Sequence, residues 1–153
     1  MINRLLTGCC FFLFCGSVLA NAPKIDGLWQ ASYAKSNTPS SNICIKTLSD
    51  GKLEGRIKKA FPRPGENPEN KCTACPGDQK NKPFENLRIL WGMKPSGNNT
   101  WDGGQLLDPE TGKVYSGTMT LSKDGKTVDM RGYILGMKFL GATDELKRLS
   151  DAC

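Results

Sequence analysis

The fold class of this chain is decided by Trp101–Tyr133, WDGGQLLDPETGKVYSGTMTLSKDGKTVDMRGY. Within it, two turn sequences, at 108–113 and 122–126, separate three segments of alternating apolar and polar residues. The apolar residues of the middle segment recur at every second position from 115 to 121, which is the period of a strand with one buried and one solvated face. Glycine, proline and aspartate in the turns favour tight reversals of the chain. The stretch therefore predicts three consecutive antiparallel strands.

Further segments before and after this stretch show the same alternation. Between two of them, Ser49-Asp50-Gly51 is a strong hairpin signal, because glycine accepts a positive φ without a Cβ clash. Short connections indicate a meander, and closing a meander into a barrel removes its exposed edges. We therefore predict an all-β fold, a single antiparallel up-and-down β-barrel of about eight strands. Outside 101–133, the predicted strands are 25–34, 42–48, 52–61, 84–93 and 134–143, and 144–149 is either a last helical turn or a fraying strand.

The composition limits the classes of function. The 153 residues suffice for one small domain, and 17 glycines and 9 prolines favour turn-rich β structure over a helical bundle. The net charge of +6 is mild and spread along the chain, so it favours contact with anionic surfaces and provides no basic groove for nucleic acid. Histidine is absent, which excludes Ser–His and Cys–His nucleophile pairs and histidine metal sites. We expect no enzymatic activity, no cofactor and no metal.

Residues 1–20 have the three parts of an export signal. Arg4 provides a short basic start, 5–19 an apolar run, and Val18-Leu19-Ala20 a small-residue cleavage site. The apolar run is too short to span a bilayer securely. We therefore predict cleavage near Ala20, a periplasmic or secreted protein without a transmembrane span, and a single barrel domain over 21–153.

Export changes the interpretation of the cysteines. Four of them follow the leader, at 44, 72, 75 and 153. In an oxidising compartment, four cysteines indicate two disulfides, with three possible connectivities. We favour a local Cys72–Cys75 bridge, with Cys44–Cys153 tying the C-terminal tail to an early strand.

The loop 62–83, PRPGENPENKCTACPGDQKNKP, interrupts the strand pattern with prolines at 62, 64, 68, 76 and 83. Irregular loops of this length are usually functional or held by a staple, and the cysteine pair provides a staple. A reactive Cys-x-x-Cys pair needs a stabilised thiolate, usually at a helix N-terminus packed on a sheet, whereas Pro76-Gly77 follows here at once. Zinc held by all four cysteines conflicts with the oxidising compartment. We therefore favour a structural disulfide.

Six short motifs occur in the order typical of a known family. They are Gly27-x-Trp29, Gly55-Arg56-Ile57, Cys72-x-x-Cys75-x-Gly77-Asp78-x-Lys80-x-x-Pro83, Trp101-x-Gly103-Gly104, Asp108-Pro109-x-x-Gly112-Lys113-x-Tyr115 and Arg131-Gly132-Tyr133. By these motifs, nearly all of the mature chain resembles domain-of-unknown-function family 2147, a group of exported bacterial proteins. The resemblance implies a lipocalin-like, or calycin-like, barrel in the bacterial envelope and supplies no established activity. The chain departs from the family pattern at 141–148, where GATDELKR replaces Gly-Arg-Thr-x-x-Trp-x-Arg.

Gly27-x-Trp29 is also similar to a lipocalin motif in which the tryptophan closes the barrel base against a late basic residue. By that resemblance, Arg131 or Arg148 would cover the indole face, in a cation–π contact of about 0.5–2 kcal/mol. This role is structural and involves no ligand.

The predicted ligand site is the barrel interior. Its candidate lining residues are Trp29, Tyr33, Trp91, Tyr115, Arg131 and Tyr133. An inward Arg131 would bind a carboxylate or phosphate, whereas inward Met130 and Gly132 would place it outside. The alternative is that the aromatic residues are core and rim side chains of a filled barrel.

These features predict a non-enzymatic barrel that binds a small apolar or amphipathic molecule. An alternative is an interaction module that docks an envelope protein or an anionic surface through the basic 62–83 loop. A third hypothesis is thiol–disulfide exchange at Cys72 and Cys75.

Overall fold

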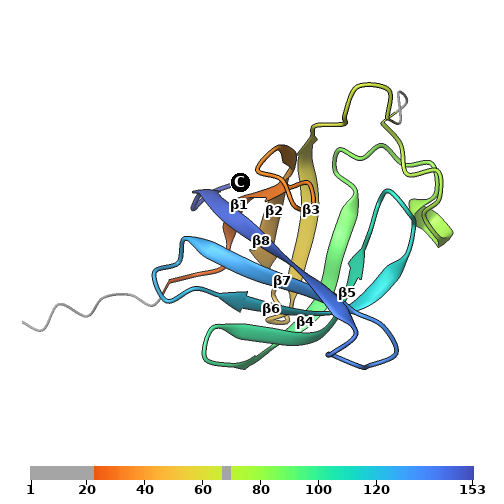
Figure 1. Ribbon diagram of the computed structural model, residues 1–153. Helices are drawn as coiled ribbons and strands as arrows, with labels where there is room; N and C mark the ends of the chain where they lie inside the picture. Colours follow the sequence, from red (N-terminus) through yellow and green to blue (C-terminus); the bar gives the residue numbers. More distant parts are fainter. Residues whose placement is uncertain (1–22, 67–69) are drawn as a thin grey trace, which may run out of the picture.

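Residues 23–66 and 70–153 are described by a computed structural model, and they form one closed antiparallel barrel (Figure 1). The predicted leader, residues 1–20, lies outside the described residues, as do 67–69 of the long loop. The described residues contain one short 3-10 helix, η1, Gly77–Gln79, and no helix long and apolar enough to cross a membrane. The strands are β1 Gly27–Ser32, β2 Pro39–Thr47, β3 Leu53–Ala60, β4 Arg88–Gly97, β5 Thr100–Leu107, β6 Val114–Leu121, β7 Thr127–Tyr133 and β8 Gly141–Ser150.

Each strand pairs with the next one in the chain, in the order β1-β2-β3-β4-β5-β6-β7-β8. The barrel closes where β8 pairs with β1, through Trp29–Arg148 and Gln30–Lys147 among others. Closure pairs the two strands that would otherwise be edges, which protects an all-β chain against edge-to-edge aggregation. The prediction of an all-β, up-and-down barrel of about eight strands is confirmed.

The last strand lies later in the chain than predicted. The sequence predicts a strand over 134–143, but 134–140 form the β7–β8 turn and β8 follows it. Within this turn, the amide of Met137 donates to the carbonyl of Ile134, 3.0 Å away, so the chain reverses instead of extending. The sequence signal of β8 is weak, because Leu146 is the one buried residue of the strand.

The barrel interior contains a packed core. Trp29, Met93 and Met119 are fully buried there. Two glycines on neighbouring strands make room for Met93, since a Cβ on Gly104 would lie 2.2 Å from its Cγ and one on Gly117 would lie 2.4 Å from its Cε. The packing supports the filled-barrel alternative for the centre of the molecule. Other buried core residues are Ile43, Ile45, Leu53, Ile57, Leu90, Leu106, Leu121, Val128 and Leu146.

β4 departs from the predicted alternation, in which Trp91 and Met93 share the inward face. Met93 lies opposite Leu53 and is fully buried, whereas Trp91 lies opposite Glu54 on the outer face. The register shifts between these two pairs at Gly92, whose φ of +75° is typical of a glycine bulge.

The long loop packs onto the barrel and contains the disulfide Cys72–Cys75. Both cysteines are buried, and the sulfur of Cys72 lies 3.2 Å from the carbonyl oxygen of Pro109 in the β5–β6 turn. Nearby, Gln79 donates from Nε2 to the carbonyl of Arg88, 2.6 Å away, at the start of β4. Buried sulfur atoms are closed to an attacking thiolate, which disfavours the redox hypothesis.

The second disulfide, Cys44–Cys153, joins β2 to the C-terminal tail across a sequence separation of 109. Together the two bridges use the four cysteines that follow the predicted leader. They are the pairs that the sequence favours.

Candidate functional site

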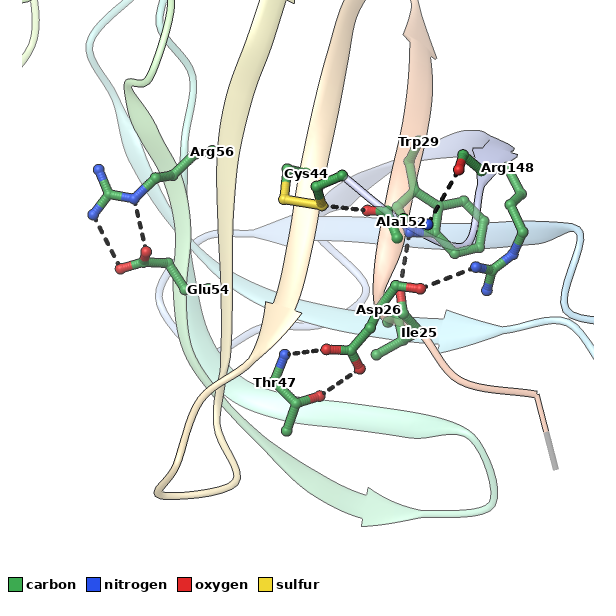
Figure 2. Close-up of a disulfide and its surroundings, with 12 residues drawn as sticks. Ile25, Asp26, Trp29, Cys44, Thr47, Glu54, Arg56, Arg148 and Ala152 are labelled. Atoms are coloured by element: carbon green, nitrogen blue, oxygen red, sulfur yellow. Dashed lines mark hydrogen bonds and ion pairs between the residues drawn. A yellow bond between two sulfur atoms is a disulfide. The ribbon is translucent and has the colours of Figure 1, made fainter. Parts of the chain in front are cut away.

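The base of the barrel is closed by Trp29 and Arg148 (Figure 2). The indole Nε1 of Trp29 donates to the carbonyl of Ile25, 2.9 Å away, and the Arg148 guanidinium lies 4.1 Å from the ring centroid. Arg148 also donates to the carbonyls of Gly125, at 2.6 Å, and Asp26, at 3.0 Å. Of the two arginines that the lipocalin motif allowed, the one on β8 therefore covers the indole. Trp29 is a structural plug and not the wall of a cavity.

Arg131 faces outward, so it does not line the barrel interior. Its neighbour Met130 lies opposite the buried Met119, which places Met130 inside and Arg131 outside. Arg131 donates from Nε and Nη2 to the carbonyl of Lys138, at 3.0 and 2.6 Å, and from Nη1 to Thr143 Oγ1, at 2.9 Å. Of the two orientations that the sequence left open, the structure has the outward one, so Arg131 is not a cavity residue and its guanidinium holds the β7–β8 turn.

Tyr133 points to the outer face of the barrel, where its side chain is buried in a hydrogen-bonded cluster around Asp102. Asp102 Oδ1 accepts from Tyr133 Oη at 3.1 Å and from Thr118 Oγ1 at 3.0 Å. The amide of Gly103 donates to the same oxygen at 2.7 Å, and Lys138 Nζ binds Oδ2. Burial raises the pKa of the Asp102 carboxyl, but the hydrogen bonds, led by that from Lys138, outweigh it and lower the pKa to about 2. Tyr133 braces the outer wall and is corrected as a cavity residue.

A small hollow of about 340 Å³ lies beside this cluster on the outer wall. Trp91 is one of its lining residues, which corrects the prediction that its side chain faces the interior. The hollow is close to the lower limit of small-molecule sites, roughly 300 Å³. Its lining includes Trp91, Gly92, Gly103, Gln105, Ser116 and Tyr133.

Tyr33 and Tyr115 lie toward the end of the barrel opposite the Trp29 plug. Tyr115 is half-buried and packs against the core. Tyr33 donates from Oη to the carbonyl of Phe61 at 2.6 Å, and the Arg63 guanidinium lies 3.9 Å from its ring centroid. The six predicted residues therefore do not share one cavity, because two face the interior, one lies at its end and three lie on the outer wall.

A larger hollow, of about 810 Å³, lies at the base of the barrel. It runs between the segment that precedes β1 and the β4–β5 turn, and it is open to solvent. Its volume falls within the range of small-molecule sites, roughly 300–1,000 Å³. The lining combines apolar, polar and charged groups and includes Pro23, Lys24, Asp26, Thr47, Pro95, Thr100 and Trp101.

One wall of this base hollow is fixed by Asp26 (Figure 2). Its Oδ1 accepts from the amide of Thr47 at 2.7 Å and its Oδ2 from the Thr47 hydroxyl at 2.8 Å. Both carboxylate oxygens thus join the chain before β1 to the end of β2. This favours a role for Asp26 in fixing the wall of the hollow over a role as a free general base. Within residues 23–66 and 70–153, no three His, Cys, Asp or Glu side chains gather into a metal site.

Trp101 is the aromatic residue of the base hollow, and it is not among the residues predicted from the sequence to line a ligand site. It is half-buried, packs against the core and lies opposite Met119. Alternation counted back from the inward Leu106 places Trp101 outside, but a bulge at Gly103, with φ of +72°, reverses the count. The signal that could have found it is the Gly103-Gly104 pair, because a glycine inside a strand often marks a bulge.

An eight-stranded up-and-down barrel, with Gly-x-Trp on its first strand and an arginine of its last strand over the indole, defines a lipocalin-like protein. The chain belongs to the family described as "Uncharacterized protein conserved in bacteria (DUF2147)", whose match spans residues 27–148. The family predicted from the six motifs is thereby confirmed. A comparison with curated proteins finds no match.

Among solved structures, the chain is similar to protein HP1028 from Helicobacter pylori, which is described as belonging to the lipocalin family. The TM-score is 0.70 at 18% sequence identity, and the similarity covers 84% of this chain and 85% of that chain. At this identity the similarity shows the fold, a lipocalin-like barrel.

Proposed function

We propose that the protein is an exported, non-enzymatic barrel that binds a small apolar or amphipathic molecule in the base hollow. The observation that carries this proposal is the 810 Å³ hollow beside the half-buried indole of Trp101. Small eight-stranded barrels either fill their interior with side chains or hold one small ligand. Here the centre is filled, and the base hollow offers more room for a ligand than the 340 Å³ hollow on the outer wall.

The lining of the hollow supports an amphipathic ligand. Trp101 and Pro95 offer apolar surface, and an indole provides a large flat contact area. Thr100 adds a polar group and Lys24 a charged one, and both can orient the polar end of a ligand. A molecule with an apolar body and a small polar end fits this combination.

Two further observations support export and a role without catalysis. The pairs Cys44–Cys153 and Cys72–Cys75 are typical of a protein that matures in an oxidising compartment. The carboxylate nearest the hollow, Asp26, has both oxygens occupied by Thr47, and the chain has no histidine to act as a base.

Titration with the amphipathic fluorescent probe anilinonaphthalene sulfonate tests the site. We expect Trp101→Ala to weaken probe binding by about tenfold or more, because one large aromatic contact is removed. Trp91→Ala is the matched control, since Trp91 is also a half-buried tryptophan but lies on the outer wall. Equal affinities of wild type and Trp101→Ala would contradict the proposal.

A further inference from the structure

The turn between β7 and β8, residues 134–140, ILGMKFL, presents a cluster of large apolar side chains to solvent. Leu135 is 84% exposed and Phe139 is 76% exposed. Ile134 and Leu140 in the same turn are also exposed. Apolar side chains scattered singly on a surface are ordinary, but a contiguous exposed group marks a contact surface. We call these four residues the apolar tip.

The backbone holds the apolar tip outward. Leu135 has a φ of +53°, a conformation that glycine and asparagine adopt far more readily than leucine. Arg131 clamps the turn by donating twice to the carbonyl of Lys138, and Lys138 Nζ binds Asp102. A leucine at such a position, in a turn fixed by hydrogen bonds, points to a role for the exposed side chain itself.

Basic side chains lie at the same end of the barrel as the apolar tip. Consecutive strands run in opposite directions, so the β1–β2, β3–β4, β5–β6 and β7–β8 connections all meet at one end. Among the described residues, the acidic side chains on these connections are Glu66, Asp78, Glu85, Asp108 and Glu110. Glu66 pairs with Arg63, Asp78 pairs with Lys82, and Asp108 is bound within its own turn by Thr111. Outside these ion pairs, the exposed basic residues on or beside the connections include Lys35, Lys58, Lys59, Lys80 and Lys113, so basic charge exceeds acidic charge at this end.

We propose that this end of the barrel docks on an anionic lipid surface, with the apolar tip inserted at the interface and the basic side chains against the headgroups. Apolar insertion combined with basic charge is a pair of signals that gives stable peripheral binding, where either signal alone is marginal. The apex of a turn is convex, and a fluid bilayer interface accommodates a convex apolar tip without a matching pocket. The charge of the surrounding loops complements anionic headgroups.

This proposal is independent of the ligand site. The base hollow lies beside the β4–β5 turn, at the opposite end of the barrel. Substitutions in the apolar tip therefore leave the hollow intact, and the failure of one proposal would not decide the other.

Sedimentation with vesicles tests the proposal, using phosphatidylglycerol–phosphatidylcholine mixtures and phosphatidylcholine alone. We expect the protein to bind the anionic vesicles more tightly, with binding that weakens as salt is raised. The double variant Leu135→Ser/Phe139→Ser should bind them about tenfold or more weakly, because two apolar side chains no longer insert. Leu48→Ser/Leu149→Ser is the matched control, since both leucines are exposed at the other end of the barrel, and it should bind within about twofold of wild type.

Circular dichroism of both double variants checks that the barrel is retained. The proposal is overturned if wild type does not sediment with anionic vesicles, or if the two double variants bind alike. Sedimentation velocity without lipid provides a further check. A dimer that forms with rising concentration and is lost in Leu135→Ser/Phe139→Ser would assign the apolar tip to a second copy of the chain and overturn the lipid proposal.

Discussion

At the scale of single residues, Arg148 connects segments that are far apart in the sequence. Its guanidinium lies over the indole of Trp29 and donates to three backbone carbonyls. They belong to Lys24, Asp26 and Gly125. The side chain is 15% exposed, so these hydrogen bonds are made largely away from water and keep more of their strength than surface ones. Arg148 therefore joins the last strand, the first strand and the β6–β7 turn.

We expect Arg148→Lys to lower the free energy of unfolding by about 2–3 kcal/mol, since an ammonium cannot reach several carbonyls while lying flat over an indole. Urea denaturation followed by circular dichroism measures the loss. Arg56→Lys is the matched control, because Arg56 is 39% exposed and pairs with Glu54 on the outer face (Figure 2). That change should cost less than about 1 kcal/mol. Equal losses would contradict the role of Arg148.

A substitution at Leu135 can separate the stability of the barrel from its binding to vesicles. We expect Leu135→Asn to keep the free energy of unfolding or raise it by up to about 1 kcal/mol, because asparagine adopts a positive φ more readily. The same variant should bind anionic vesicles more weakly than wild type. Urea denaturation and vesicle sedimentation of one preparation measure both quantities. A variant that loses stability but keeps its vesicle binding would show that the leucine serves packing.

Asp102 makes the outer wall sensitive to acid. Its folded-state pKa of about 2 lies below the ordinary value of 3.8, so its contribution to stability is present above about pH 4 and is lost as the pH falls toward 2. Because the side chain is partly solvated, we expect this contribution to be about 1–2 kcal/mol. Asp102→Asn should lower stability at pH 7 and flatten its dependence between pH 4 and 2. Urea denaturation across this range measures both effects, and parallel curves for the two proteins would refute the assignment.

At the scale of elements, the strands that could be predicted are those that keep strict alternation. β6 and β7 satisfy this condition, and their positions follow from the sequence. In β4 and β5, Gly92 and Gly103 adopt a positive φ and reverse the inward–outward alternation. For this reason, counting along the strand could not predict which face of the sheet carries Trp91 or Trp101. The last strand was predicted too early in the chain, because most residues of β8 are exposed and polar alternation is weak there, while the turn before it is apolar.

The glycines opposite Met93 provide a test of the core packing. A Cβ on Gly104 would meet the backbone nitrogen of Met93 at 2.6 Å, whereas the nearest neighbours of one on Gly117 are side-chain atoms of Met93 and Leu106. We expect Gly104→Ala to cost more than Gly117→Ala, which should cost about 1–3 kcal/mol. Adding Met93→Ala should offset part of the cost of Gly117→Ala but little of that of Gly104→Ala. A double-mutant cycle measures this coupling, and equal rescue of both would contradict the packing.

At the scale of the whole molecule, Cys44–Cys153 restrains nearly the entire barrel, because it spans a sequence separation of 109. We expect Cys44→Ala/Cys153→Ala to lower the free energy of unfolding by about 2–5 kcal/mol, mainly by enlarging the conformational freedom of the unfolded chain. Thermal and urea unfolding measure the loss, and reductant should reproduce it in wild type. A change below about 1 kcal/mol would show that the tail is held by β8 pairing alone.

The class of the molecule was more predictable than its site. Alternation and turn residues suffice to predict a closed barrel. The Gly-x-Trp motif limited the residue that covers the Trp29 indole to two arginines, and in the structure it is Arg148. The base hollow depends on how the chain before β1 and the β4–β5 turn lie against each other, which no local pattern encodes. For the same reason Trp101, placed by a bulge, could not be found by counting residues.

The central claim is that a small amphipathic molecule occupies the base hollow. Native mass spectrometry of protein purified from its own cell envelope tests it most directly. We expect an additional mass bound to wild type, retained in Trp91→Ala and lost in Trp101→Ala. Wild type that carries no additional mass, or an additional mass that Trp101→Ala retains, would contradict it.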